Sequence, residues 1–506
     1  MGWTEGYQSE TDYVLGYFPE LSPNLIRFGM TLSGYAPPPD GPYLELGFGR
    51  GLSLNLHAAS NPGEFWGTDF LPWHVAEARL LGAASGARLL DDSFEELAER
   101  QDLPQFSWMT AHGVYSWIDP RQRSVLRGLY RDRLTPGAAV YLSYNTMPGW
   151  AEMAPLQRFL RFYVENMSSP SDTVEARLKE AFGLIDLMRT AQAGAFENRP
   201  HLLTRLERAA KSDISYIAHE YLNAGWDVLY FSDVAHEMSE AKLRFACGSS
   251  PMEAIPALSE PPAIKDILAT IGDATMRHQM IDYAVNRGFR KDIFVRGGRR
   301  LPEAEYRSRV LALRITNASM SDPEAWEFDG PMGKVQLHES HYAPALDVLR
   351  RASRPMTLRD LGAATQKDFN TIKEVAAALV GAGLAYACHE EDATSAVRKK
   401  CAALNKVIRE RAAIDGQIQF LASPVTGTGI QVSRFEQFFI SAIEARQDGA
   451  AALAKHAFAQ LQSVGHAAVV DGTVLKTEAE NLEYFTGQAR TFLDKRLPLL
   501  KRLGIA

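Results

Sequence analysis

Three alternating glycines at residues 47–51 constrain this 506-residue chain more than any other feature. An apolar run at residues 43–46 leads into Gly47, Gly49 and Gly51, and an amphipathic stretch follows at residues 52–59. Glycine adopts positive φ readily and lets a ligand approach the backbone closely. The start of the following helix supplies free N–H groups and the positive end of the helix dipole. The pattern predicts a strand, a tight turn and a helix that form a nucleotide-type pocket.

An acidic residue, Asp69, ends the next apolar run, about twenty positions after the glycines. A carboxylate at that strand end is placed to accept hydrogen bonds from ribose hydroxyls. A dinucleotide site needs a third glycine in G-x-G-x-x-G, but Leu52 or Leu54 stands there in either register. A P-loop is not supported either, because no G-x-x-x-x-G-K-[ST] occurs. The remaining alternative is a purely structural glycine turn.

The pattern E-x-G-x-G-x-G, which begins at Glu45, resembles motif I of class I S-adenosylmethionine (AdoMet) methyltransferases. This resemblance implies AdoMet as the cofactor. It places the glycines under the methionine and ribose of AdoMet, and Glu45 where it orders the loop or meets the methionine ammonium. Asp69 is expected on the ribose hydroxyls. The other cofactor-binding residues expected near the adenine or the strand ends are Phe70, Asp92, Phe94 and His112.

Ser93, with Glu96 three residues later, matches a helix capping box just after the expected third strand. Asp92 and Phe94 flank Ser93, so each also has a structural interpretation, as a helix cap or as a core aromatic. The cofactor roles of these two residues therefore stay open beside the structural ones.

Alternating strand and helix patterns over the first 150 residues predict an α/β fold with a parallel sheet, helices on both faces and ligands at the carboxyl ends of the strands. Class I methyltransferase sheets end with two further strands, and residues 242–247 and 292–296 are the candidates for them. The helical residues 151–223 then interrupt the sheet as a lid or substrate-docking cap.

We expect five units along the chain. They are an AdoMet-binding Rossmann-like core (1–150), a helical cap and regulatory or middle domain with the last sheet strands (151–297), a connector (298–337), a winged-helix-like unit (338–395) and a helical C-terminal domain (396–506).

The residues after the expected fourth and fifth strands are the candidates for catalysis. His112 near its ordinary pKa could take a proton from an incoming ammonium, and Tyr115 and Trp117 could hold an alkylammonium by cation–π contact. Asn145 follows the fifth strand and faces the same cleft. The Asn-Pro-Pro-Tyr motif of amino-directed DNA and glutamine methyltransferases is absent here, which weakens a nucleobase-amine substrate. The structural alternative is that the aromatic rings pack against AdoMet and the cap.

Several longer segments resemble bacterial methyltransferases with a methyltransferase regulatory domain, including the rickettsial protein-lysine methyltransferases that modify an outer-membrane protein. The segments are HGVYSW (112–117), SYNTMPGW (143–150), AHEYLN (218–223), YFSDV (230–234), NRGFRKD (286–292) and LASPVTG (421–427). The resemblance implies a protein substrate, a middle domain and C-terminal helical parts with a winged-helix-like module. It also suggests that Tyr7 or Tyr13 folds over AdoMet.

The amino-acid composition argues against several other classes of protein. The chain has 54 basic and 61 acidic residues, hence a net charge of −7, so no global basic field attracts nucleic acid. Three scattered cysteines indicate a reducing compartment rather than a disulfide framework or zinc site. Without 18 consecutive apolar residues or a signal-peptide pattern, we expect a cytoplasmic protein with no membrane span.

Two His-Glu pairs lack the H-E-x-x-H spacing of a zinc site, so no metal is expected. For His219 and Glu220, the first of these pairs, packing of the cap is the default role.

The leading hypothesis is therefore an AdoMet-dependent methyltransferase that acts on protein lysine side chains. Methylation of a small molecule or natural product is the alternative. A winged-helix nucleic-acid-binding regulator is a hypothesis of another class. It is disfavoured because the expected third helix, residues 368–383, carries only Lys373 as a base. The sequence leaves the oligomeric state open, a homodimer included.

Overall fold

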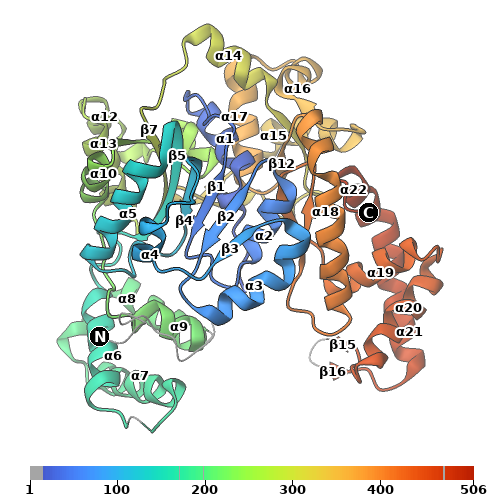
Figure 1. Cartoon of the computed structure of the whole chain (residues 1–506), viewed down its shortest axis with the longest axis horizontal. Helices are drawn as coiled ribbons and strands as arrows, with labels where there is room; N and C mark the ends of the chain where they lie inside the picture. Colours follow the sequence, from blue (N-terminus) through green and yellow to red (C-terminus); the bar gives the residue numbers. More distant parts are fainter. Residues whose placement is uncertain (1–14, 170, 198, 213, 471–472) are drawn as a thin grey trace.

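A seven-stranded sheet lies at the centre of the computed structural model (Figure 1), which describes residues 15–169, 171–197, 199–212, 214–470 and 473–506. Tyr7 and Tyr13 lie outside the described residues. The strand order is β3-β2-β1-β4-β5-β7-β6. The strands are β1 (Tyr43–Leu46), β2 (Phe65–Thr68), β3 (Arg88–Leu90), β4 (Phe106–Ala111), β5 (Leu134–Asn145), β6 (Leu243–Gly248) and β7 (Phe289–Arg296).

Strands β1 to β5 are parallel, whereas β7 runs antiparallel to both β5 and β6. The predicted final strands are thus confirmed, although they come from segments separated from β5 by about a hundred residues or more. The predicted Rossmann-like α/β fold with a mostly parallel sheet is also confirmed.

Helices cover both faces of the sheet because its inner strands, such as β1 and β4, are buried along their whole length. One face packs against α1 (Pro23–Leu32), α2 (Leu52–Ser60) and α3 (Pro72–Ser85). The other packs against α4 (Phe94–Glu99), α5 (Pro120–Arg133) and α10 (Phe231–Glu240). A capping box lies at the N-terminus of α4 and of α5. The one formed by Ser93 and Glu96 at α4 confirms the sequence prediction.

Four helices between β5 and β6 form the cap: α6 (Ala154–Asn166), α7 (Val174–Thr190), α8 (Pro200–Lys211) and α9 (Ile214–Tyr221). They group together at one end of the sheet in Figure 1 and have a hydrophobic cluster of their own, from Trp150 to Tyr221. Two backbone hydrogen bonds, from Met147 N to Leu229 O and from Leu229 N to Asn145 O, join the two ends of the cap at the sheet. Shorter helices follow β6, namely α11 (Pro256–Ser259), α12 (Lys265–Ala269) and α13 (Ala274–Val285).

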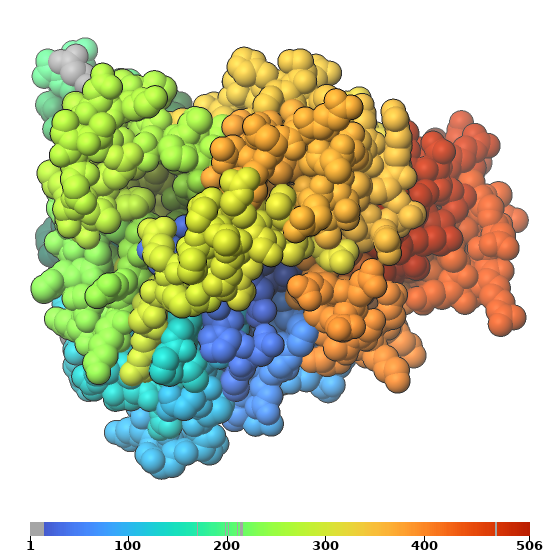
Figure 2. Space-filling model, turned by 90° about the horizontal axis from the view of Figure 1, so that it is seen from above, coloured from blue at the N-terminus to red at the C-terminus, as the bar shows by residue number. Residues whose placement is uncertain are grey.

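The range predicted as a connector contains regular structure. It holds α14 (Glu303–Ala312), β8 (Arg314–Asn317) and the hairpin β9 (Glu327–Gly330) and β10 (Gly333–Gln336). Strand β8 lies between β11 (Met356–Thr357) and β12 (Ala385–Cys388) in an antiparallel sheet. Helices α15 (Glu339–Arg351), α16 (Leu358–Thr365) and α17 (Phe369–Gly381) share one core with this sheet. Figure 2 shows the yellow α14 region between the green middle segment and this unit in orange.

The C-terminal region packs against the sheet's helices rather than standing apart. Helix α18 (Glu391–Ala412) lies beside α2 and α3 (Figure 1), and Leu56 and Leu81 share a core with Leu404 and Ile408. The remaining elements are β13 (Phe420–Ser423), β14 (Thr428–Gln431), α19 (Arg434–Glu444), α20 (Ala450–Ser463), β15 (Val469–Val470), β16 (Thr473–Val474), α21 (Glu478–Thr491) and α22 (Leu497–Arg502). Among the described residues, no helix is both long and apolar enough to cross a membrane.

Candidate active site

The glycine turn connects β1 to α2 and needs its glycines at each position. Gly47, Gly49 and Gly51 have φ of +68°, +59° and +73°, a region that other residues rarely adopt. A Cβ on Gly51 would lie 2.4 Å from Ala78 Cβ, and one on Gly47 would lie 2.7 Å from Val114 Cγ2. Both distances are far below van der Waals contact, so any side chain would displace the turn from its neighbours.

Asp69, directly after β2, is tied to this turn. One carboxylate oxygen, Oδ2, accepts a hydrogen bond from Gly49 N at 2.8 Å, and the other, Oδ1, accepts one from Leu71 N at 3.1 Å. His74 Nδ1 lies 3.2 Å from Oδ1. The buried carboxylate thus links the glycine turn to the start of α3.

A cavity of about 380 Å³ opens at the carboxyl ends of β1, β2, β3 and β4. This volume lies within the range of small-molecule sites. The cavity brings together most of the residues predicted to hold the cofactor: Gly47, Gly49, Asp69, Phe70, Asp92, Phe94 and His112. The positive-φ turn at its wall, the carboxylate beside that turn and two aromatic rings suit a nucleoside with a charged amino-acid tail. The residues present therefore fit AdoMet.

Two carboxylates predicted for the cofactor have protein partners. The Asp92 carboxylate pairs with Arg100 at 2.9 Å while still lining the cavity. Glu45 lies on β1, buried and away from the cavity wall, and accepts a hydrogen bond from Tyr43 Oη at 3.3 Å. Burial raises the pKa of Glu45 to about 8. Gly51 also lies off the cavity wall, as the residue that precedes α2.

A second cavity, of about 470 Å³, adjoins the first and shares His112, Gly113 and Trp117 with it. Its other walls come from the end of β5 and from the cap. They include Phe18, Asn145, Trp150, Arg205, Tyr216, Glu220 and Phe289. Two of the four predicted catalytic residues, His112 and Trp117, therefore stand between the cavities, and Asn145 lines the second.

His112 does not have its ordinary pKa. Its Nδ1 lies 2.9 Å from Tyr141 Oη, and its ring contacts Phe18 with a centroid distance of 4.0 Å. Burial is the main cause that lowers the pKa of His112, to about 4. The prediction of a histidine near pKa 6.5 is therefore wrong, and the imidazole is neutral at pH 7.

Tyr115 is not part of the site. Its side chain is fully buried, with its hydroxyl hydrogen-bonded to Glu237 on α10 and its ring 5.7 Å from the Arg123 guanidinium. Burial raises the pKa of Tyr115. The hypothesis that Tyr115 holds a substrate ammonium is therefore wrong, because this ring packs in the core between the sheet and α10.

Glu220 is the residue whose position the sequence did not reveal. It lies on α9 in the wall of the second cavity, where its Oε1 accepts a hydrogen bond from Asn145 Nδ2 at 3.3 Å. Burial raises the pKa of Glu220 to about 7. Only the insertion of the cap between β5 and β6 brings these two residues together. A metal site at the His-Glu pairs was not expected, and the described residues hold no group of three metal-binding side chains.

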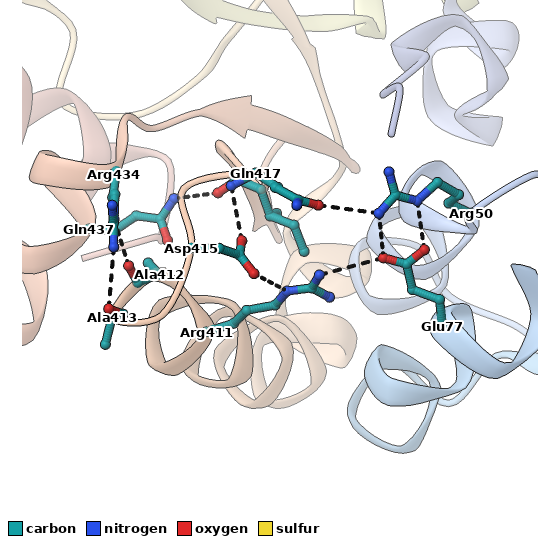
Figure 3. Close-up of polar contacts among 10 residues, drawn as sticks. Arg50, Glu77, Arg411, Ala412, Ala413, Asp415, Gln417, Arg434 and Gln437 are labelled. Atoms are coloured by element: carbon teal, nitrogen blue, oxygen red, sulfur yellow. Dashed lines mark hydrogen bonds and ion pairs between the residues drawn. The ribbon is translucent and has the colours of Figure 1, made fainter. Parts of the chain in front are cut away.

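The outer side of the glycine turn is held by the C-terminal region (Figure 3). Arg50, between the last two glycines of the turn, donates to Glu77 of α3 at 2.6 and 2.7 Å and to Gln417 Oε1 at 3.2 Å. Arg411 of α18 also reaches Glu77, at 3.5 Å, and pairs with Asp415. The turn that forms the cofactor cavity is thus linked to residues more than 300 positions later.

Comparison with known proteins agrees with this fold. Residues 213–296 match the family model described as a predicted methyltransferase regulatory domain. An uncharacterised protein of Synechocystis sp. is 36% identical over 520 aligned positions, which cover 100% of both chains. PKMT2 from Rickettsia typhi in complex with AdoHcy has a TM-score of 0.68 at 18% identity, over 95% of this chain and 98% of that one. A second structure of PKMT2 gives the same TM-score at 16% identity, over 98% of this chain and 100% of that one.

The fold and the glycine-turn site define a class I AdoMet-dependent methyltransferase. The chain belongs to one family with the uncharacterised Synechocystis protein, and its residues 213–296 match the model of a predicted methyltransferase regulatory domain.

Proposed function

We propose that the enzyme methylates lysine side chains of a protein. The observation that carries this proposal is the second cavity, which shares a wall with the cofactor cavity. Its walls combine the Glu220 carboxylate with the rings of Trp117, Trp150 and Tyr216. A carboxylate beside aromatic faces is the chemistry that recognises an alkylammonium group. A lysine side chain is long and thin enough to bring its terminal nitrogen to such a shared wall.

The first cavity is proposed to bind AdoMet, which supplies a methyl group on a positively charged sulfur. Gly47 and Gly49 allow close approach of the ligand, and Asp69 accepts hydrogen bonds from the ribose hydroxyls. Phe70 and Phe94 pack against the adenine, and Asp92 accepts from its amino group. Because alignment of two bound reactants alone removes roughly 7–11 kcal/mol of a barrier, positioning is the main task of these residues.

Two further observations support a protein as the substrate. The segments quoted above resemble rickettsial protein-lysine methyltransferases, and PKMT2 of Rickettsia typhi has the same fold over nearly the whole chain. The helical unit built on α15, α16 and α17 is proposed as a protein-docking module. A nucleic-acid role is disfavoured because Lys373 on α17 is half-buried, with its amine 5.9 Å from the Tyr306 ring centroid, and burial lowers its pKa. Salt-sensitive binding to duplex DNA in a mobility-shift assay would contradict this assignment.

We place the reaction in the cytoplasm. The three cysteines, Cys247, Cys388 and Cys401, are all buried free thiols, which suits a reducing compartment.

The test is incubation of the purified enzyme with labelled AdoMet and a bacterial lysate, followed by separation of protein from small molecules. Label in protein, mapped by peptide mass spectrometry to lysine, is the expected result. Label confined to the small-molecule fraction would reject a protein substrate and favour methylation of a metabolite or natural product.

A further inference from the structure

Glu220 is a partly buried carboxylate with no cation beside it among the described residues. Glu45 on β1 has none either, but Glu45 lies away from both cavities. Asp282 and Asp292 lie 2.6 and 2.8 Å from the Arg290 guanidinium, as buried acids usually require. For Glu220, by contrast, the described part of the chain offers no ion pair within 4.0 Å, and its hydrogen-bond donor is the neutral Asn145 amide. A partly buried carboxylate in a cavity wall loses hydration, and a ligand cation would replace that lost stabilisation.

A positive charge in the same cavity wall, Arg205 of α8, is directed elsewhere. Its guanidinium lies 3.7 Å from the Trp150 ring centroid and donates to Gly149 O at 3.2 Å. Arg205 therefore lowers the pKa of Glu220 only through space, and burial outweighs that effect. The cavity, of about 470 Å³, is lined both by Glu220 and by the residues shared with the cofactor cavity, and its volume has room for a second cation.

Asn145 fixes the position of Glu220 relative to that wall. Its backbone N donates to Ser116 Oγ at 2.8 Å, and its carbonyl accepts from Leu229 N at 3.1 Å. Ser116 is the residue before Trp117, which belongs to both cavities. The carboxylate is thus connected through a buried amide to the loop where the two reactants would meet.

We propose that Glu220 is a catalytic residue that binds the substrate lysine ammonium and accepts one of its protons. This inference rests on the proposed function. An ammonium has no lone pair, and lysine with a pKa of about 10.4 is almost wholly protonated at neutral pH. Transfer of one N–H proton to the Glu220 carboxylate leaves a neutral amine. The amine nitrogen then forms a bond to the methyl carbon while the carbon–sulfur bond breaks and the sulfur keeps the electron pair.

The tyrosines, His112 and Arg205 around the second cavity do not suit this task. His112 has a lowered pKa of about 4 and is a weak base, and burial raises the pKa of Tyr216. Tyr221 has a raised pKa for the same reason, and the Arg205 guanidinium carries donors and no acceptor. His219, the residue before Glu220, also lines the cavity. Glu220, with a pKa of about 7, is an acceptor in its ionised form above that pH and is protonated below it.

The first experiment measures binding without any methyl transfer. Tryptophan fluorescence, with Trp117 and Trp150 in the cavity walls, is titrated with n-butylammonium in the presence of AdoHcy at pH 8.5. The wild-type enzyme and the control Glu175→Gln, an exposed site on α7, are expected to bind the amine alike. Glu220→Gln, which keeps the shape of the side chain, is expected to lose at least tenfold in affinity. Equal affinity of Glu220→Gln and wild type would overturn the proposed ammonium site.

The second experiment follows the pH dependence of kcat on poly-L-lysine. The wild-type kcat is expected to rise with pH through about pH 7, and this rising limb of the profile reports ionisation of Glu220. Glu220→Gln is expected to lower kcat about 100-fold or more and to lose the rising limb. The Kd of this variant for AdoMet is expected to stay unchanged. Glu220→Asp, which retains a carboxylate one methylene farther away, is expected to keep the limb at a reduced rate.

The outcomes separate the two proposals. Lysine methylation by wild type, with Glu220→Gln within threefold of its kcat and with the same pH profile, would reject the role of Glu220 alone. Absence of methylation on poly-L-lysine and on every lysine of the lysate would reject the proposed function. If Glu220→Gln fails to bind AdoMet, the Glu220→Asp variant tests the proposal instead. A Glu220→Asp enzyme whose kcat no longer rises with pH would contradict the proton-acceptor role.

Discussion

Arg50 in the glycine turn holds the Glu77 carboxylate of α3 through two hydrogen bonds of 2.6 and 2.7 Å. The same carboxylate is reached by Arg411 from α18, so one acidic side chain joins the cofactor turn to the C-terminal region (Figure 3). The charges are partly exposed, which limits the energy of each pair. The arrangement nevertheless gives the C-terminal region a direct contact with the turn on which cofactor binding depends.

Arg411→Ala is expected to weaken AdoMet binding about two- to fivefold, because partly exposed ion pairs contribute roughly 0.2–1 kcal/mol. Isothermal titration calorimetry measures the change. Lys406→Ala, at an exposed position on the same helix, is the control and should leave the affinity unaltered. An Arg411→Ala affinity equal to that of wild type would show that the turn holds its shape without this contact.

Asp69→Ala is expected to abolish detectable AdoMet binding. The substitution removes both the proposed ribose acceptor and the carboxylate that holds Gly49 N and Leu71 N. Asp69→Asn retains one acceptor oxygen for these backbone donors and should bind weakly. Calorimetry at neutral pH distinguishes the variants, and an unchanged Kd for Asp69→Ala would refute the assignment of the cofactor cavity.

Gly51→Ala is expected to destabilise the protein by roughly 1–3 kcal/mol, because a non-glycine residue at φ +73° is strained and the new Cβ would meet Ala78 at 2.4 Å. Gly183→Ala in α7 is the matched control. No atom lies within 4 Å of its added Cβ, and alanine favours a helix by about 1 kcal/mol over glycine. The midpoint of urea unfolding should therefore fall for Gly51→Ala and rise for Gly183→Ala. A neutral Gly51→Ala would contradict the tight packing of the turn.

Glu45→Gln is expected to stabilise the ligand-free protein at pH 9 but not at pH 4. Burial raises the folded-state pKa of Glu45 to about 8, above its ordinary value of 4.5. Below pH 4.5 the carboxyl is protonated in both the folded and the unfolded state, so its ionisation does not change the free energy of unfolding. Between pH 4.5 and 8 the unfolded chain ionises first, so stability falls as pH rises, and it levels off above pH 8. Thermal melts across this range measure the difference, and parallel melting curves for the two proteins would contradict the raised pKa.

Structural features that depend only on residues close together in the sequence could be predicted. The turn at Gly47 to Gly51 follows from glycine's access to positive φ, and the capping box at Ser93 follows from a three-residue spacing. The regular structure within residues 298–337 was missed because β8 is only four residues long and pairs with β12, about seventy positions later. Short strands with distant partners carry little local pattern.

The direction of side chains in the loop after β4 was equally beyond the sequence. Tyr115 and Trp117 are two residues apart and offer similar aromatic chemistry, yet Trp117 lines both cavities and Tyr115 packs in the core against α10. The pKa of His112 likewise depends on burial by residues from other parts of the chain, with Phe18 directly against its ring. No spacing rule distinguishes these outcomes, since each depends on the neighbour that the fold supplies.

The sequence by itself determined the class of fold and the cofactor turn, because glycine conformation, strand alternation and helix capping act over a few residues. The tertiary structure decided what lies opposite that turn. Asn145 and Glu220 are 75 positions apart and meet only because the cap folds back between β5 and β6. Arg411 reaches Glu77 only because α18 packs on α3. Burial and charge at these junctions are properties of the packed molecule.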